Sequence, residues 1–96
     1  MKNLTSVYLR FPRYENVEEI THLSVMTIIP EKGTVIKLEH DLIELYAQYF
    51  KGIDMDAAKW YVSEITESIG VQTHSIYVTI YSEALNKPYF FETMYV

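Results

Sequence analysis

The sequence contains no cysteine and only three glycines among its 96 residues. Without cysteine the chain can form no disulfide, thiolate metal site or cysteine nucleophile. The glycines, Gly33, Gly52 and Gly70, lie far apart, which excludes a glycine-rich phosphate-binding loop. Long apolar runs are also absent, so no transmembrane helix and no signal peptide is expected. Together these absences predict a cytoplasmic protein.

Motifs for catalysis or metal binding are equally scarce. The three histidines, His22, His40 and His74, show neither the H-x-H nor the H-x-x-x-H spacing of a zinc site. Asp54 and Asp56 could form a carboxylate pair, but an N-cap followed by a charge in the first turn of a helix is the simpler explanation. We therefore expect no catalytic residue, no bound metal and no cofactor.

The composition is that of one small globular domain. Hydrophobic residues make up 49% and charged residues 22% of the chain, which is ordinary for a folded protein. A chain of 11.3 kDa buries enough surface for one modest core. We therefore treat residues 1–96 as a single domain.

The net charge of −5 is unevenly distributed. Residues 39–67 contain seven acidic side chains and two lysines, so this stretch alone carries the whole net charge. An acidic balance argues against direct binding of nucleic acid or of an anionic membrane. It favours a basic protein partner, and a merely solvated helical face is the alternative explanation.

Alternating apolar and polar residues predict strands, and apolar residues at helical spacing predict two helices. Pro12 ends the first predicted strand, and Gly52 and Gly70 follow the predicted helices. Residues 34–38 fit either a short extended segment or the lead-in to a helix. The predicted strands are residues 5–11, 20–29, 75–81 and 89–96, and the predicted helices are residues 39–51 and 54–69.

This order predicts an α+β fold, with a four-stranded antiparallel sheet and two helices on one face in the order ββααββ. The helices are expected to bury one apolar stripe each against the sheet. The two stripes include Leu45 and Tyr49 in the first helix and Val62 and Ile65 in the second. Both stripes are expected to face the strand residues Val7, Leu9, Val25 and Ile76.

Tyrosine is unusually frequent, with nine residues. Tyr77 and Tyr81 alternate with apolar residues, and with Tyr89 they are expected to line the face of a C-terminal hairpin that the helices leave open. Tyrosine is enriched at interfaces because its rigid ring buries a large area at low entropic cost. The predicted partner-binding residues are Glu64, Glu67, Tyr77, Tyr81 and Tyr89.

The predicted order of elements resembles that of the tunnelling-fold (T-fold) superfamily. Gly33 and Val35 before Leu38 look like this family's turn into its first helix, and Glu83 lies where family members hold a heterocycle with a glutamate. The resemblance implies a homo-oligomeric ring that binds a pterin-like or purine-like molecule between subunits through Glu83.

Three functions follow from these observations. The first is a non-catalytic protein-interaction module or inhibitor that binds a basic, nucleic-acid-handling protein. Its composition is similar to that of small phage-encoded inhibitors, anti-CRISPR proteins among them. The second is a T-fold enzyme or heterocycle-binding relative, and the third is a structural homo-oligomer. We prefer the first interpretation because the sequence presents acidic and aromatic residues without a catalytic set.

Overall fold

The computed structural model describes residues 4–24, 26 and 28–86. Within these residues five strands form one mixed sheet, accompanied by one short α-helix and two 3-10 turns. The strands are β1 (Leu4–Phe11), β2 (Ile20–Ser24), β3 (Val35–Ile36), β4 (Trp60–Ile69) and β5 (Thr73–Tyr81). The helix is α1 (His40–Tyr46), and the 3-10 turns are η1 (Ala47–Tyr49) and η2 (Glu83–Asn86).

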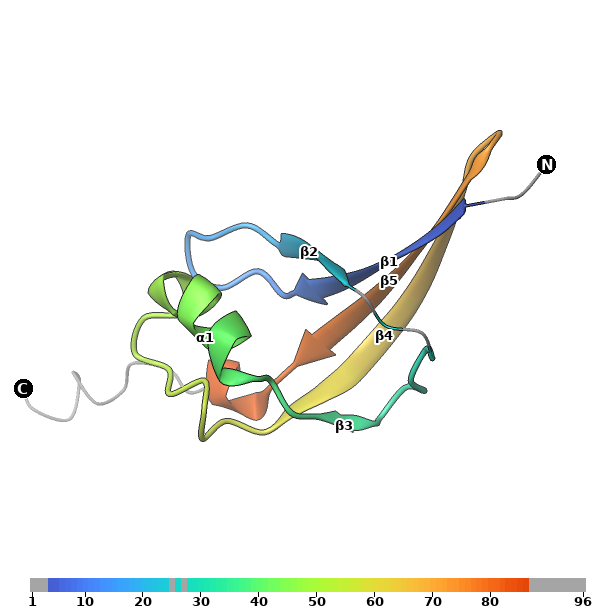
Figure 1. Cartoon of the computed structure of the whole chain (residues 1–96). Helices are drawn as coiled ribbons and strands as arrows, with labels where there is room; N and C mark the ends of the chain where they lie inside the picture. Colours follow the sequence, from blue (N-terminus) through green and yellow to red (C-terminus); the bar gives the residue numbers. More distant parts are fainter. Residues whose placement is uncertain (1–3, 25, 27, 87–96) are drawn as a thin grey trace, which may run out of the picture.

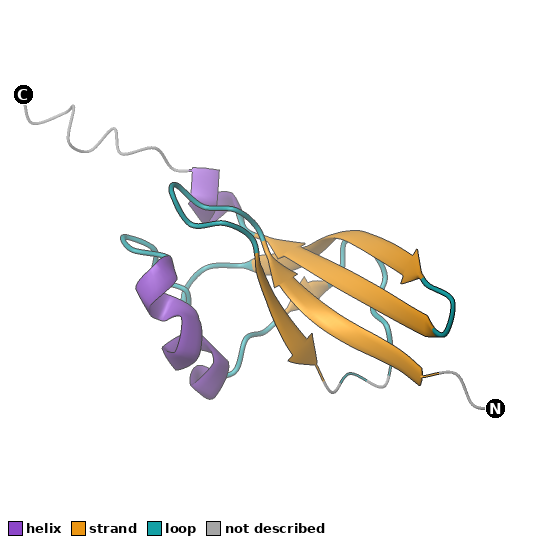
Figure 2. Cartoon of the chain, turned by 90° about the horizontal axis from the view of Figure 1, so that it is seen from above, coloured by secondary structure: helices purple, strands orange, loops and turns teal. Residues whose placement is uncertain are grey.

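The sheet has the strand order β2-β1-β5-β4-β3. Its central pair, β1 and β5, is parallel, and all the other pairs are antiparallel. The sheet curves into a half-barrel with β2 and β3 at its two edges, and α1 lies at one end of it (Figures 1 and 2). The long β4–β5 hairpin extends away from the helix at the other end (Figure 1).

The prediction of four antiparallel strands and two helices in the order ββααββ is wrong. Residues 60–69, expected in the second helix, form β4 and pair with β5. A register shift between Val62 and Glu64 explains the error. Val62 lies opposite Ile80 and Ile65 lies opposite Val78, so these two residues share a face although they are three positions apart. A spacing of three is also typical of an amphipathic helix, which is why the bulged strand resembled one.

Asp54 does cap backbone amides, but in a turn and not at the start of a long helix. Its Oδ1 accepts hydrogen bonds from the amides of Asp56 at 3.1 Å and Ala57 at 3.2 Å. This turn leads directly into β4. Gly70, expected to end the helix, instead begins the β4–β5 connection, where its amide donates to the Thr73 carbonyl at 2.8 Å.

Other predicted elements are present. The strands at residues 5–11 and 75–81 are confirmed as β1 and β5, and α1 with η1 confirms most of the first helix. The second strand is confirmed only up to Ser24, and within residues 34–38 a short strand, β3, forms. The predicted strand at residues 89–96 lies outside the described residues.

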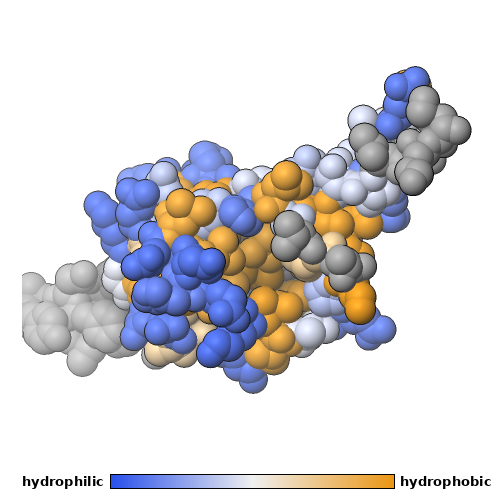
Figure 3. Space-filling model, in the orientation of Figure 1, coloured by the Kyte–Doolittle hydropathy of each residue, from blue (hydrophilic) through white to orange (hydrophobic). Residues whose placement is uncertain are grey.

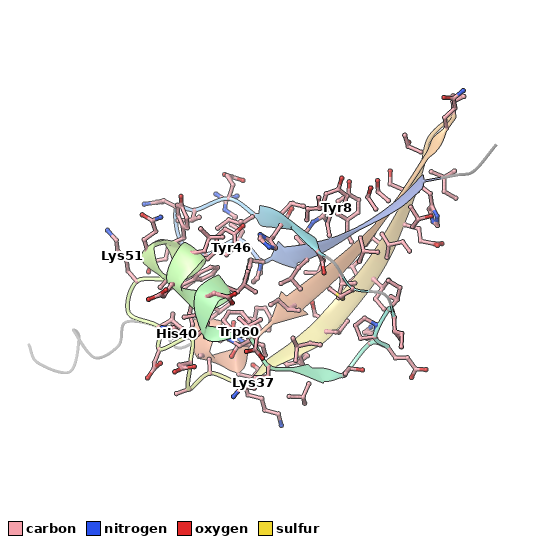
Figure 4. The ribbon with its side chains drawn as sticks, viewed as in Figure 1. Tyr8, Lys37, His40, Tyr46, Lys51 and Trp60 are labelled. Carbon is pink, nitrogen blue, oxygen red and sulfur yellow. The ribbon has the colours of Figure 1, made fainter. Side chains whose placement is uncertain are left out.

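An aromatic cluster forms the centre of the core. Phe11 of β1 contacts Trp60 of β4 edge-on, with ring centroids 6.0 Å apart, and Phe50 contacts both rings. The Trp60 indole Nε1 donates to the Met55 carbonyl at 3.1 Å, so the buried polar atom of the ring is satisfied. Trp60 is only 1% exposed and lies beside α1 (Figure 4).

The predicted packing of the helical stripe is wrong for three of its four residues. Leu45 is 53%, Tyr49 39% and Ile65 36% exposed, whereas Val62 is fully buried. Within α1, Leu45 comes two positions after the buried Ile43 and therefore points to nearly the opposite side of the helix. After Tyr46 the helix changes to a 3-10 turn, beyond which Phe50 faces the core while Tyr49 faces outward.

We predict that Trp60→Ala lowers the free energy of unfolding by about 3–5 kcal/mol, because it empties the middle of the aromatic cluster. Leu45→Ala, on the exposed side of α1, is expected to cost less than about 1 kcal/mol. Urea denaturation of both variants measures the difference. Equal losses for the two variants would contradict the described orientation of α1.

Candidate functional site

The sheet has a second face, opposite the core. On β1, Leu9 and Phe11 point into the core while Tyr8 and Arg10 alternate with them and lie on the other side. Cross-strand partners share a face, so Tyr8 groups with Tyr77, and Tyr81 with Tyr61. We call the surface formed by Tyr8, Arg10, Tyr61, Tyr77 and Tyr81 the tyrosine face.

The middle of the tyrosine face is a stacked unit. The rings of Tyr8 and Tyr77 lie 5.2 Å apart and nearly parallel, at 18°. The Arg10 guanidinium carbon lies 4.2 Å above the centre of the Tyr77 ring, within the range of a cation–π interaction. The Arg10 Nε is buried and has no hydrogen-bond partner among the described residues. The ring stacking and the cation–π contact hold Tyr8, Arg10 and Tyr77 in place before any partner binds.

A hydrogen-bonded network borders the same face where β5 meets η2. The Tyr61 hydroxyl donates to Glu83 Oε2 at 3.0 Å, and Asn86 Nδ2 donates to Glu83 Oε1 at 3.0 Å. The Tyr81 hydroxyl donates to Asn86 Oδ1, which joins the two tyrosines through one continuous chain of contacts. Their rings pack edge to face with centroids 6.1 Å apart.

Glu83 controls the ionisation of this network. Its hydrogen bond, followed by burial and its negative charge, raises the pKa of Tyr61 above the ordinary tyrosine value. Burial and then the Glu83 charge raise the pKa of Tyr81, against a lowering by the Asn86 hydrogen bond. Both phenols are therefore neutral hydrogen-bond donors near pH 7 and are not phenolate bases or nucleophiles.

The structure places the predicted partner-binding residues on both sides of the sheet. Tyr77 and Tyr81 lie on the tyrosine face, and Glu64 joins them because it lies opposite Thr79. Glu67 lies opposite Ile76 on the other face, where its carboxylate contacts His74 Nε2 at 3.1 Å. Tyr89 is outside the described residues.

Sequence reasoning missed three members of the tyrosine face: Tyr8, Arg10 and Tyr61. The alternation along residues 5–11 already placed Tyr8 and Arg10 opposite the buried residues of that strand, so the signal for them was present. Tyr61 has no such signal, because the apolar spacing in residues 54–69 predicts a helix.

The acidic stretch does not form one continuous surface. Its seven acidic residues are all exposed, but they belong to different elements. Three lie at or on α1, two in the turn before β4, and two on opposite faces of β4. These residues are Glu39, Asp41, Glu44, Asp54, Asp56, Glu64 and Glu67.

The three histidines have separate partners. His22 Nδ1 lies 2.6 Å from the Tyr46 hydroxyl, and His40 Nε2 lies 3.3 Å from the Glu44 carboxylate on α1. His74 contacts Thr5 and Glu67 near the far end of the hairpin. In the part of the chain that the structure describes, no group of three or more His, Asp or Glu side chains is placed to hold a metal ion.

Comparison with protein-family models, with curated proteins and with solved structures finds no match for this chain. Among the described residues, no helix has the length and apolar character needed to cross a membrane.

We predict that Glu83→Gln lowers the pKa of Tyr61 toward about 10, because the variant removes the charge-assisted hydrogen bond that favours the neutral phenol. NMR titration of the tyrosine ring carbons measures this change, and Glu64→Gln is the control expected to leave Tyr61 unchanged. The raised pKa also means that the stability contributed by this contact is present below about pH 10 and is lost as pH rises through the folded-state pKa. A Tyr61 pKa that stays unchanged in Glu83→Gln would contradict the network.

Proposed function

We propose that this chain is a non-catalytic protein-binding module and that its tyrosine face is the binding surface. The observation that carries the proposal is the pre-arranged group of Tyr8, Arg10 and Tyr77 on the sheet face opposite α1. Tyrosine and arginine dominate the energetics of many protein interfaces. Side chains already held by stacking lose little conformational entropy on binding, which favours affinity.

A basic partner suits the charges around this face. Glu64 and Glu83 lie with the tyrosines, and the whole chain carries a net charge of −5. Acidic groups at the border of an interface steer a basic partner and speed its association. An inhibitor of a nucleic-acid-handling protein is the specific form that we propose, because an acidic, aromatic surface can occupy a groove that otherwise holds phosphates.

Heterocycle binding at Glu83 is the competing function. Both carboxylate oxygens of Glu83 already accept hydrogen bonds, from Tyr61 and Asn86. A bound pterin or purine would therefore have to displace one of these contacts. The ββααββ order that suggested this function is also not the order of the structure.

The test begins with capture of a partner by the immobilised wild-type chain, followed by kinetic measurements on the purified pair. We predict that Tyr77→Ala weakens binding by about 1–4 kcal/mol, mainly through faster dissociation. Tyr49→Ala is the matched control, because Tyr49 is an exposed tyrosine of η1 outside the tyrosine face. Equal affinity of wild type and Tyr77→Ala, with both proteins folded, would contradict the proposed surface.

Charge reversal on β4 provides a second, independent comparison. Glu64→Lys and Glu67→Lys change the net charge equally but act on opposite faces of the sheet. We expect Glu64→Lys to slow association more than Glu67→Lys, and to flatten its salt dependence.

A thermal-shift screen of pterins and purines on wild type and Glu83→Gln tests the competing function. Stabilisation of the wild type alone would favour heterocycle binding over our proposal.

A further inference from the structure

An apolar groove lies on the core side of the sheet, between the edge strand β2 and the segment that leads from β3 into α1. Its volume is about 450 Å³, which is within the range of pockets that hold small molecules. Figure 3 shows hydrophobic surface between the polar residues of α1 and the strands. Because α1 covers only one end of the core face, the groove is open to a ligand.

The lining of the groove is mainly apolar. Leu9 of β1 and Leu38 are buried, and the half-buried side chains of Met26, Ile36 and Leu42 complete the apolar part. Water beside these half-buried side chains is released when an apolar group covers them, which favours binding. The body of a ligand in the groove should therefore be apolar as well.

Two carboxylates border the groove where the chain enters α1. Glu39 and Asp41 line it and are exposed, against a single lysine, Lys37. Among the described residues neither carboxylate has a basic partner, since the nearby His40 pairs with Glu44 at 3.3 Å. The border of the groove therefore favours a positively charged group on the ligand.

His22 contributes a further polar group from the side of β2. Its Nδ1 lies 2.6 Å from the Tyr46 hydroxyl, and the two rings pack edge to face with centroids 5.4 Å apart. Tyr46 reaches from α1 toward β2 (Figure 4) and so fixes the orientation of the imidazole. The Nε2 of His22 has no hydrogen-bond partner among the described residues and is available to a polar atom of the ligand.

Charge also distinguishes between the possible occupants of the groove. In a symmetric contact with a second copy of this chain, Glu39 and Asp41 would approach the same carboxylates of the other copy, and like charges repel. An apolar anion such as a fatty acid would meet the same repulsion. An apolar cation is attracted to both carboxylates and covers the apolar lining at the same time.

We propose that this groove binds a small molecule that consists of an apolar body and a protonated amine. The body covers Leu9, Met26 and Leu42, and the ammonium group lies against Glu39 and Asp41. The site is on the opposite side of the sheet from the tyrosine face and does not depend on the function proposed for that face.

The experiment uses the full chain and three probes, phenylbutylamine, phenylbutanol and phenylbutyrate, which share one apolar body and differ in the charge of the head group. We expect the amine to cause saturable shifts of the NMR signals of Met26 and Leu42, with the signals of Tyr77 unchanged. The amine is expected to bind about fivefold more tightly than the alcohol, because only the amine pairs with the carboxylates. Phenylbutyrate is expected to bind more weakly than the alcohol.

Asp41→Asn removes one charge while keeping the shape of the side chain. We expect it to weaken binding of phenylbutylamine about threefold and to change the affinity for phenylbutanol by less than about twofold. Glu44→Gln is the matched control, because Glu44 is an exposed carboxylate of α1 that does not line the groove. This control is expected to change the affinity for each probe by less than about twofold.

Several outcomes would overturn the proposal. Equal binding of the amine and the alcohol, or tighter binding of phenylbutyrate, would exclude selection of a cation. Unchanged affinity of Asp41→Asn for the amine would exclude the proposed pairing. Absence of saturable shifts with every probe, or shifts confined to the tyrosine face, would exclude the site. Shifts of Met26 and Leu42 that depend on protein concentration without any probe would assign the groove to a second copy.

Discussion

The ring of Phe11 on β1 packs against the ring of Trp60 on β4, and this contact joins two strands of the sheet in one core. β1 and β4 are not neighbours; β5 lies between them. The aromatic rings therefore link strands that share no backbone hydrogen bonds, and Phe50, after the helical segment, completes the cluster. The described helical structure is short, and buried residues outside helices and strands, such as Phe50 and Met55, complete the core beside it.

That arrangement leaves a large part of the sheet uncovered. A helix of seven residues covers only one end of the core face, so the groove beside β2 stays accessible. On the opposite face, tyrosines and Arg10 stack on one another. Tyrosine suits such a position because its ring packs against neighbours while its hydroxyl keeps contact with water or a polar partner.

Individual elements could be predicted from local pattern, although the fold could not. The alternation in β1 and β5 is regular, and the apolar spacing before Phe50 is typical of a helix. The candidate site was partly predictable for the same reason, because Tyr77 and Tyr81 alternate with buried residues. The strand β4 and the orientation of its side chains were not predictable, since the bulge between Val62 and Glu64 changes which residues of β4 face the core. Across a bulge, residues that share a face of the strand are three positions apart, which is also a spacing found on one face of a helix.

The sequence by itself determined the absence of cysteine chemistry, the acidic charge, the individual strands β1 and β5, and the surplus of tyrosine. These properties depend on composition or on short-range alternation, which a single segment contains. Only the tertiary structure decided that β1 pairs in parallel with β5, that Glu64 and Glu67 lie on opposite faces, and that Tyr8 stacks on Tyr77. Such pairings join residues far apart in the chain, and they follow from the burial of the whole core and not from local preference.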